Sequence, residues 1–304
     1  MNDFIIRKKK GKTFIFYDKK GNILNKKNVH KYLTFYIPPG YDNVKINKKN
    51  GKILAIGYDE KSRPQYIYNK SFTKKRNILK FSDLIDFGKN YKKIFNKIQS
   101  DLYTTKESKE KQIATILMLI IECDFRVGND KYTKDNKSYG VTTLESRHII
   151  NKKGKILIDF IGKKGVRNKC LINNTKIIRN LKTKKKTLKK NNRIFTYRKN
   201  DNYYTIKSTD VNKYLKQLGN YSTKYFRTWS ANISLINNLK KNIEIKESII
   251  ITAEKLHHTT SICKQNYLDP KLIKFYEKNK NKFLDFFSGD VNKKYYEFLK
   301  LNYK

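Results

Sequence analysis

Three segments of the sequence carry residue types that could act on a phosphodiester. They are CDFRVGNDKYTKDNKSYGVTTLESRHI at residues 123–149, TKYFRTW at residues 223–229 and HHTTSICKQNY at residues 257–267. The sequence has no Walker A motif, no nucleophile elbow, no H-E-x-x-H zinc motif and no paired aspartates of the two-metal nuclease type. Without such a motif, fixed side chains must neutralise the reacting phosphate, and arginine suits this because its planar fork pairs with two oxygens. The segments therefore favour phosphoryl transfer supported by arginine, with no metal and no cofactor.

The elements that must position these segments divide into a β-rich start and a mainly helical remainder. Residues 3–68 read as short alternating strands broken by turn residues, among them the Asn50-Gly51 pair. Residues 84–98 instead carry apolar side chains at helical spacing. This pattern predicts an α+β fold, with a small, mostly β domain at residues 1–75 and a larger, mainly α-helical domain at residues 76–304.

The second domain is expected to be helical with one β interlude. A helix should begin at Ser108, run through the apolar residues 113–121 and end near Gly128. The other expected elements are a hairpin with strands at residues 156–162 and 166–172 around the basic tip Lys163-Lys164-Gly165, a lysine-rich loop at residues 182–190, a short helix at residues 210–218 and at least one helix after Pro270.

The chain is strongly basic, and this indicates its partner. Its 304 residues include 70 Lys+Arg and 26 Asp+Glu, which gives a formal net charge of +44. Such an excess draws a protein onto a polyanion, above all nucleic acid, and a membrane surface is the weaker alternative. A hydrophobic content of 38% supports a folded core. Because lysine accompanies abundant Asn and Ile, as in A/T-biased coding sequences, the charge indicates DNA without establishing it.

Cysteine usage and hydropathy bear on the compartment. Cys123, Cys170 and Cys263 are far apart, and their odd number without a C-x-x-C pair argues against a disulfide framework and against a zinc site. We therefore expect a reducing compartment. The start of the chain lacks signal-peptide features, and the apolar run at residues 113–121 is too short to span a bilayer. These features predict a soluble, intracellular protein located at DNA, with no membrane partner.

Together with three further motifs, the segments resemble the type IB DNA topoisomerases, especially the compact poxvirus-type viral enzymes. The further motifs are IPPGYDNVKI at residues 37–46, RPQYIYN at residues 63–69 and FIGKKG at residues 160–165. The resemblance implies relaxation of supercoiled duplex DNA through single-strand cleavage, a 3′-phosphotyrosyl intermediate, strand rotation and religation, without ATP or metal. It also implies a monomer whose two domains form a C-shaped clamp around duplex DNA. A viral source would place the protein in the virion or at a cytoplasmic replication site.

Carried over by motif, the resemblance implies five catalytic residues. Tyr267 is the nucleophile. A free phenol has a pKa of about 10 and is a poor nucleophile at neutral pH, so cations or strong donors must surround the phosphate. Arg126, Arg227 and His258 match the contacts to the non-bridging oxygens. Lys163, at a hairpin tip, matches the general acid that protonates the leaving 5′-oxygen.

The resemblance also implies DNA-contact residues, and it has departures. The matching contact positions are Gln65, Tyr66, Tyr68, Tyr132 and Lys224. A glutamine amide can pair with the major-groove edge of adenine, and tyrosines can contact phosphates or base methyl groups. Where the family places a small residue and a proline around the catalytic histidine, this chain has His257 and Thr260. The spacing of nine residues to Tyr267 selects His258 over His257.

Each catalytic candidate also has an ordinary structural explanation when it is taken alone. These explanations are carbonyl capping by Arg126, stacking of Arg227 on Trp229, a core or loop His258, a solvated turn Lys163 and a packed Tyr267 ring. Their joint occurrence in family order favours the catalytic interpretation. The nearest rival is a tyrosine recombinase or integrase, which usually has a helical N-terminal domain and H-x-x-R at the second arginine, where this chain has Lys224. A non-enzymatic DNA-packaging protein would explain the charge but not the motifs.

Overall fold

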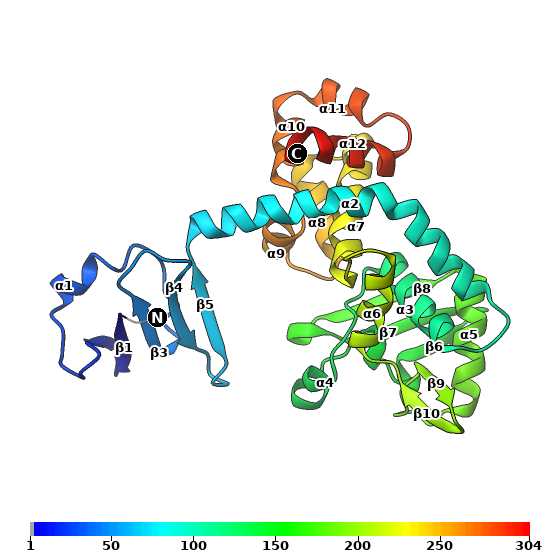
Figure 1. Cartoon of the computed structure of the whole chain (residues 1–304), viewed down its shortest axis with the longest axis horizontal. Coiled ribbons are helices and arrows are strands. Elements are labelled where there is room, and N and C mark those ends of the chain that lie inside the picture. The colour runs from blue at the N-terminus through cyan, green and yellow to red at the C-terminus, as the bar shows by residue number, and fades with distance from the viewer. Residues whose placement is uncertain (1–2) are drawn as a thin grey trace. The chain divides into compact units, whose positions relative to one another are not determined.

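The computed structural model describes residues 3–304, which form two compact units (Figure 1). The first unit ends at Lys80, and the second runs from Phe81 to Lys304. The predicted boundary at residue 75 lies inside helix α2 (Lys70–Tyr103), so the division falls within a helix and not in a linker. Among the described residues, no helix combines the length and apolar character that crossing a bilayer requires.

The first unit is built on a five-stranded antiparallel sheet with the order β2-β1-β3-β4-β5. Ile5 pairs with Ile46, and Ile46 pairs with Ala55, so the three buried side chains lie side by side on one face. The β-rich start predicted from the alternating pattern is confirmed. Its elements are β1 (Phe4–Lys10), β2 (Thr13–Tyr17), α1 (Lys26–His30), β3 (Asp42–Asn47), β4 (Ile53–Tyr58) and β5 (Pro64–Tyr68).

The second unit is mainly helical, as predicted. Besides the greater part of α2, its helices are α3 (Lys109–Cys123), α4 (Asp130–Asn136), α5 (Thr175–Thr187), α6 (Ser208–Leu218), α7 (Thr223–Lys240), α8 (Ile245–Lys255), α9 (Thr260–Asn266), α10 (Pro270–Lys278), α11 (Lys280–Phe286) and α12 (Val291–Tyr303). Helix α3 is a core helix, because every residue from Gln112 to Ile120 is buried. Ser108 caps it by accepting a hydrogen bond from the backbone N–H of Lys111. The helix ends at Cys123 and not near Gly128, because Asp124 adopts a left-handed backbone with φ 52°.

Small sheets complete the second unit. The predicted hairpin is present as β7 (Lys155–Ile161) and β8 (Arg167–Ile172), and β6 (Ile149–Lys152) joins it in the order β6-β7-β8. A second hairpin, β9 (Thr196–Lys199) and β10 (Asn202–Thr205), was not predicted. The prediction of a loop at residues 182–190 was wrong as far as Thr187, because α5 continues through most of it and buries Ile177 and Leu181 one turn apart.

The structure also corrects the prediction about cysteines. Cys123 at the end of α3 and Cys170 on β8 form a disulfide, with an S–S distance of 2.10 Å and a Cα–Cα distance of 5.7 Å. Cys263 is free and buried. The two bonded residues are 47 positions apart in the sequence and meet only because β8 packs against α3. The bond therefore joins the helix before Arg126 to the hairpin that carries Lys163.

Candidate active site

The predicted catalytic side chains meet at one pocket of the second unit. The pocket has a volume of about 430 Å³. Its lining residues belong to the α3–α4 connection, the β7–β8 turn, α7, the α8–α9 connection and α9. Its lining residues are Arg126, Lys163, Lys164, Val166, Lys224, His257, His258, Thr259, Ile262, Asn266 and Tyr267. Arg227 lies directly behind this lining and contacts His258 and Tyr267. The structure thus brings together all five predicted catalytic residues.

Arg126 is presented by a tightly packed connection after α3. Its backbone carbonyl accepts a hydrogen bond from the N–H of Val141 at 2.9 Å. Beside it, Gly128 has a φ of 99°, and a Cβ placed on Gly140 would lie 2.5 Å from the Cα of Gly128. Only glycines allow the two backbone segments to approach so closely. This packing fixes the direction from which the guanidinium enters the pocket.

Arg227 is a buried cation on the second turn of α7. It is 4% exposed, and its Nη2 donates to the backbone carbonyl of Leu256 at 3.0 Å. Its Nε and Nη1 are also buried, and neither has a hydrogen-bond partner among residues 3–304. A buried donor without an acceptor is costly to the folded state, and a charged donor is more so. The free donors of Arg227 therefore favour an anion as the missing partner.

His258 links the two arginines. The Nη2 of Arg126 lies 2.9 Å from Nε2 and 3.1 Å from Nδ1, and the Nη2 of Arg227 lies 3.0 Å from Nε2. Because a guanidinium can only donate, the imidazole must accept with a lone pair and is therefore neutral. Burial, followed by the charges of Arg126 and Arg227, lowers the pKa of His258 to about 3. A neutral ring keeps one N–H for a further acceptor.

His257, the departure from the family pattern, has a structural place beside this site. Its backbone is left-handed with φ 54°, a conformation that a small residue such as glycine adopts more easily. Its Nε2 lies 3.1 Å from the carbonyl oxygen of Cys123 and donates to it, and its ring packs against Phe125. The His257 side chain thus connects the loop before His258 to the end of α3.

Tyr267 ends α9 with its ring against the catalytic candidates. The ring centroid lies 4.8 Å from that of His258 and 5.5 Å from the guanidinium carbon of Arg227. The backbone is held by Asn232, a fully buried residue of α7. Its Nδ2 donates to the carbonyl of Tyr267 at 3.0 Å, and its Oδ1 accepts from the N–H of Asp269 at 2.8 Å. Asn232 was not predicted, although a polar residue between the apolar positions of α7 was a signal in the sequence.

Asp124 is a second residue that was not predicted from the sequence. Its side chain is fully buried two residues before Arg126, and its carboxylate lies 3.5 Å from the Nζ of Lys255. Burial raises the pKa of Asp124, and the positive charges of Lys255 and Arg227 oppose that shift. Asp124 does not line the pocket, and its carboxyl group is buried beside Lys255.

Lys163 and Tyr132 lie together at the rim. Lys163 is exposed at the β7–β8 turn, where Lys164 has a left-handed backbone with φ 64°. The Nζ of Lys163 lies 5.7 Å from the ring centroid of Tyr132, which is 49% exposed on α4. Lys224, in the first turn of α7, also lines the pocket. Two predicted residues, Lys163 and Lys224, therefore line the pocket with exposed side chains, and Tyr132 lies next to Lys163.

The remaining predicted DNA contacts lie on strand β5 of the first unit. Tyr66 is 48% exposed, and its ring stacks on Tyr68 at a centroid distance of 6.2 Å. Gln65 donates from its Nε2 to Asp59 at 2.9 Å. Strand β5 is at the edge of the sheet, with Tyr66 and Tyr68 on one face and Gln65 on the other.

Comparisons with known proteins show which family the chain belongs to. Residues 69–282 match the family model described as the catalytic core of eukaryotic DNA topoisomerase I. The chain is 30% identical to DNA topoisomerase 1B of Acanthamoeba polyphaga mimivirus, over 94% of this chain and 91% of that protein. It is 26% identical to DNA topoisomerase 1 of Rabbit fibroma virus, over 74% of this chain and 72% of that protein. It is also 26% identical to DNA topoisomerase 1B of Vaccinia virus strain Copenhagen, over 77% of this chain and 75% of that protein. Among solved structures, the XerH site-specific recombinase in a post-cleavage complex with difH matches with a TM-score of 0.38 and 13% identity, over 74% of this chain and 59% of that chain.

Proposed function

Because the chain belongs to the type IB DNA topoisomerases, we propose that it relaxes supercoiled duplex DNA by transient cleavage of one strand, rotation and religation. The observation that carries this function is the meeting of Arg126, Arg227 and His258 around Tyr267 in one pocket. Two guanidinium groups and a neutral imidazole provide the donors that a pentacoordinate phosphate needs, and a phenol lies beside them.

In the cleavage step, the hydroxyl oxygen of Tyr267 attacks the phosphorus and the bond to the 5′-oxygen breaks. The strand is then held as a 3′-phosphotyrosine, and the free 5′ end can rotate. In the free protein the two arginines donate to His258, and the buried Nε and Nη1 of Arg227 have no partner within residues 3–304. A phosphate oxygen in the pocket would accept a hydrogen bond from Arg126, which lines the pocket, in place of His258. In the free protein the pKa of His258 is lowered to about 3, so its ring is neutral near neutral pH and has one N–H that can be donated to a phosphate oxygen.

Lys163 completes the reaction as the general acid. A 5′-alkoxide is a poor leaving group unless a proton reaches it, and lysine carries that proton at neutral pH. The exposed position of Lys163 at a hairpin tip permits movement toward the scissile bond when DNA binds. Religation reverses the step, because the phosphotyrosine keeps the energy of the cleaved bond. The cycle therefore needs no ATP.

Binding is proposed to involve both units and to need only one copy of the chain. Tyr132 and Lys224 would contact DNA beside the reacting phosphate, and Gln65, Tyr66 and Tyr68 would contact it from β5. Lysines elsewhere on the surface would bind phosphates without sequence preference. Affinity should then fall steeply with salt, with a log–log slope of about −0.9 for each phosphate neutralised.

Plasmid relaxation tests the function directly. The protein should relax positive and negative supercoils in EDTA without ATP. Tyr267→Phe should abolish relaxation and leave DNA binding unchanged, because only the attacking oxygen is lost. An inert wild-type protein, or an active Tyr267→Phe variant, would contradict the assignment. Strand exchange between two sites, or a requirement for a multimer, would instead indicate a recombinase.

A further inference from the structure

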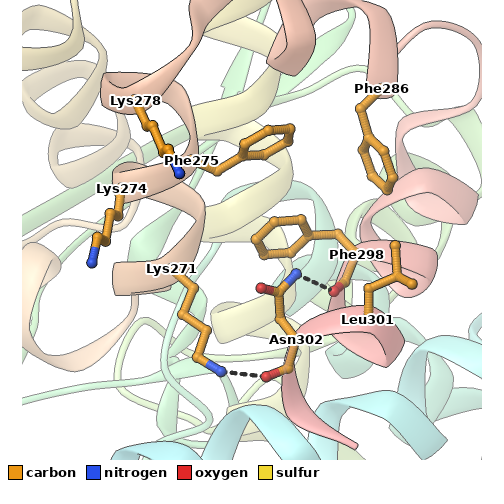
Figure 2. Close-up of a pocket in the computed structure, with 8 residues that line it drawn as sticks. All are labelled: Lys271, Lys274, Phe275, Lys278, Phe286, Phe298, Leu301 and Asn302. Carbon is orange, nitrogen blue, oxygen red and sulfur yellow. Dashed lines mark hydrogen bonds between the residues drawn. The ribbon is translucent and has the colours of Figure 1, made fainter.

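A groove separate from the active site lies among the three helices at the C-terminal end of the second unit (Figure 2). It has a volume of about 500 Å³, within the range of about 300–1,000 Å³ that is usual for binding pockets. Helix α10 forms one side, α12 the other, and α11 contributes one residue. The groove is lined by Lys271, Lys274, Phe275, Lys278, Phe286, Phe298, Leu301 and Asn302, none of which lines the active-site pocket.

The floor of the groove is aromatic and closely packed. Phe275 stacks on Phe298 with a centroid distance of 5.9 Å and meets Phe286 edge-on at 6.0 Å. Phe298 is only 3% exposed, so these rings turn their faces mainly toward one another. Leu301 stands at the edge of this floor with 75% of its surface exposed. A large aliphatic side chain so exposed beside an apolar floor suits contact with apolar side chains of a partner.

The α10 side of the groove carries a row of positive charge. Lys271, Lys274 and Lys278 recur at helical spacing and span about 10 Å along the helix axis. Lys271 contacts the neutral carbonyl of Asn302 and lies 4.2 Å from the Tyr303 ring centroid, so its charge is not cancelled. Within the described part of the chain, no carboxylate forms an ion pair with these three lysines, and Glu277, the one acidic residue of α10, does not line the groove.

We propose that this groove binds an acidic amphipathic helix of a partner protein. The apolar side chains of that helix would cover Phe275, Phe286 and Leu301, and its carboxylates would face the lysine row. Charge along about 10 Å of helix matches acidic groups that repeat along a peptide, whereas a lipid presents one headgroup. DNA offers phosphates but no aliphatic side chains, and the packed rings present few open faces for base stacking. A second copy of this chain would bring a further net charge of +44 against the row.

The test uses the full chain and a fluorescein-labelled helical peptide with leucine on one face and glutamate on the other. A shuffled peptide of the same composition, whose leucines share no face, controls for diffuse attraction to a basic protein. Fluorescence anisotropy should show that the amphipathic peptide binds at least about tenfold more tightly than the shuffled one. Equal affinity for the two peptides would overturn the proposal.

Two groove variants and a matched charge control locate the site. Leu301→Asp, and separately Lys274→Glu with Lys278→Glu, should each weaken binding of the amphipathic peptide by about tenfold. Lys213→Glu with Lys216→Glu, two exposed lysines of α6, makes the same charge change elsewhere and should have little effect. A circular dichroism spectrum and a urea midpoint close to those of wild type show that each variant is folded. Wild-type affinity in both groove variants, or an equal loss in the control pair, would overturn the proposal.

The other occupants are distinguished in the same experiment. Vesicles containing phosphatidylserine are added in place of the peptide, and sedimentation reports association of the chain with itself. If the proposal is right, Leu301→Asp and wild type should show the same vesicle binding and the same sedimentation behaviour. The proposal would be overturned if the two peptides bind equally well and Leu301→Asp alone abolishes vesicle binding or self-association. Loss of vesicle binding would then assign the groove to a lipid surface, and loss of self-association would assign it to a second copy of the chain.

Discussion

The side-chain amide of Asn232 donates to the backbone carbonyl of Tyr267 at 3.0 Å. The same amide accepts from the N–H of Asp269, so it holds the chain on both sides of Leu268. Arg227 lies five residues earlier on the same helix. One helix therefore sets both the position of a buried cation and the path of the backbone that carries the proposed nucleophile.

Asn232→Ala should slow cleavage and destabilise the protein. It leaves a carbonyl and an N–H buried without their partner, which typically costs about 1–3 kcal/mol. Urea unfolding measures the stability, and single-turnover cleavage of a DNA duplex measures the rate at a temperature where the variant is folded. Asn237→Ala, at an exposed position of the same helix, is the matched control and should resemble wild type. If folded Asn232→Ala cleaves at the wild-type rate, Asn232 does not position Tyr267.

Lys163→Ala should lower the cleavage rate by roughly a hundredfold or more, because the 5′-oxygen must then leave without a proton. When sulfur replaces the 5′-oxygen of the substrate, the leaving group is a thiolate. It needs no proton to leave, since a thiol is far more acidic than an alcohol. The defect should largely disappear on the sulfur substrate. Lys164→Ala, at the same turn, is the control. Its cleavage rate relative to wild type should be the same on the oxygen and sulfur substrates. A defect of equal size on both substrates would mean that Lys163 acts in binding and not as an acid.

Acid should destabilise the fold through His148. This residue is 8% exposed, its Nδ1 accepts from the N–H of Glu145, and burial lowers its pKa to about 4. The folded-state pKa lies below the ordinary value of 6.5, so the unfolded chain binds the proton more readily. The stability present above pH 6.5 should therefore be lost as the pH falls toward 4.

The measurement is the urea midpoint at pH 7 and pH 5 for wild type and for His148→Asn, which keeps an acceptor near the position of Nδ1. The variant should lose less stability than wild type between the two pH values. His30→Asn, at an exposed position, should follow wild type. An identical pH dependence in His148→Asn would show that another group is responsible.

Reduction of the Cys123–Cys170 disulfide should lower stability. The bond closes a loop of 47 residues, so its loss should lower the free energy of unfolding by at most about 4 kcal/mol through loop-closure entropy. Urea unfolding with and without dithiothreitol measures the difference in wild type. Cys170→Ser should be less stable than the oxidised protein and indifferent to dithiothreitol. If dithiothreitol has no effect on wild type, the bond does not form in solution.

Sequence patterns predicted the β-rich start and the helical remainder because alternation and helical spacing depend on local burial. They fail where the chain is highly charged. The pattern predicts a loop for the lysines after Leu181, yet lysine is a good helix former and Ile177 and Leu181 are buried. The disulfide could not be predicted, because only the packing of β8 on α3 brings Cys170 to Cys123.

The five catalytic candidates were reached through motif order, and the structure places them around one pocket. Their roles remain predictions until the variants are measured. Asn232 and Asp124 escaped notice because neither performs chemistry that a motif describes. Asn232 bonds to the backbone of Tyr267, and buried Asp124 pairs with Lys255, and both relationships are visible only after folding.

Helix α7 also limits which changes in chain length the protein can tolerate. Each residue advances an α-helix by about 100° around its axis. A single insertion between Arg227 and Asn232 would rotate either Arg227 away from His258 or Asn232 away from the Tyr267 carbonyl while leaving every residue type intact. Evolution along this stretch should therefore proceed by substitution, and gaps between relatives should gather in the connections before Ser222 and after Lys241.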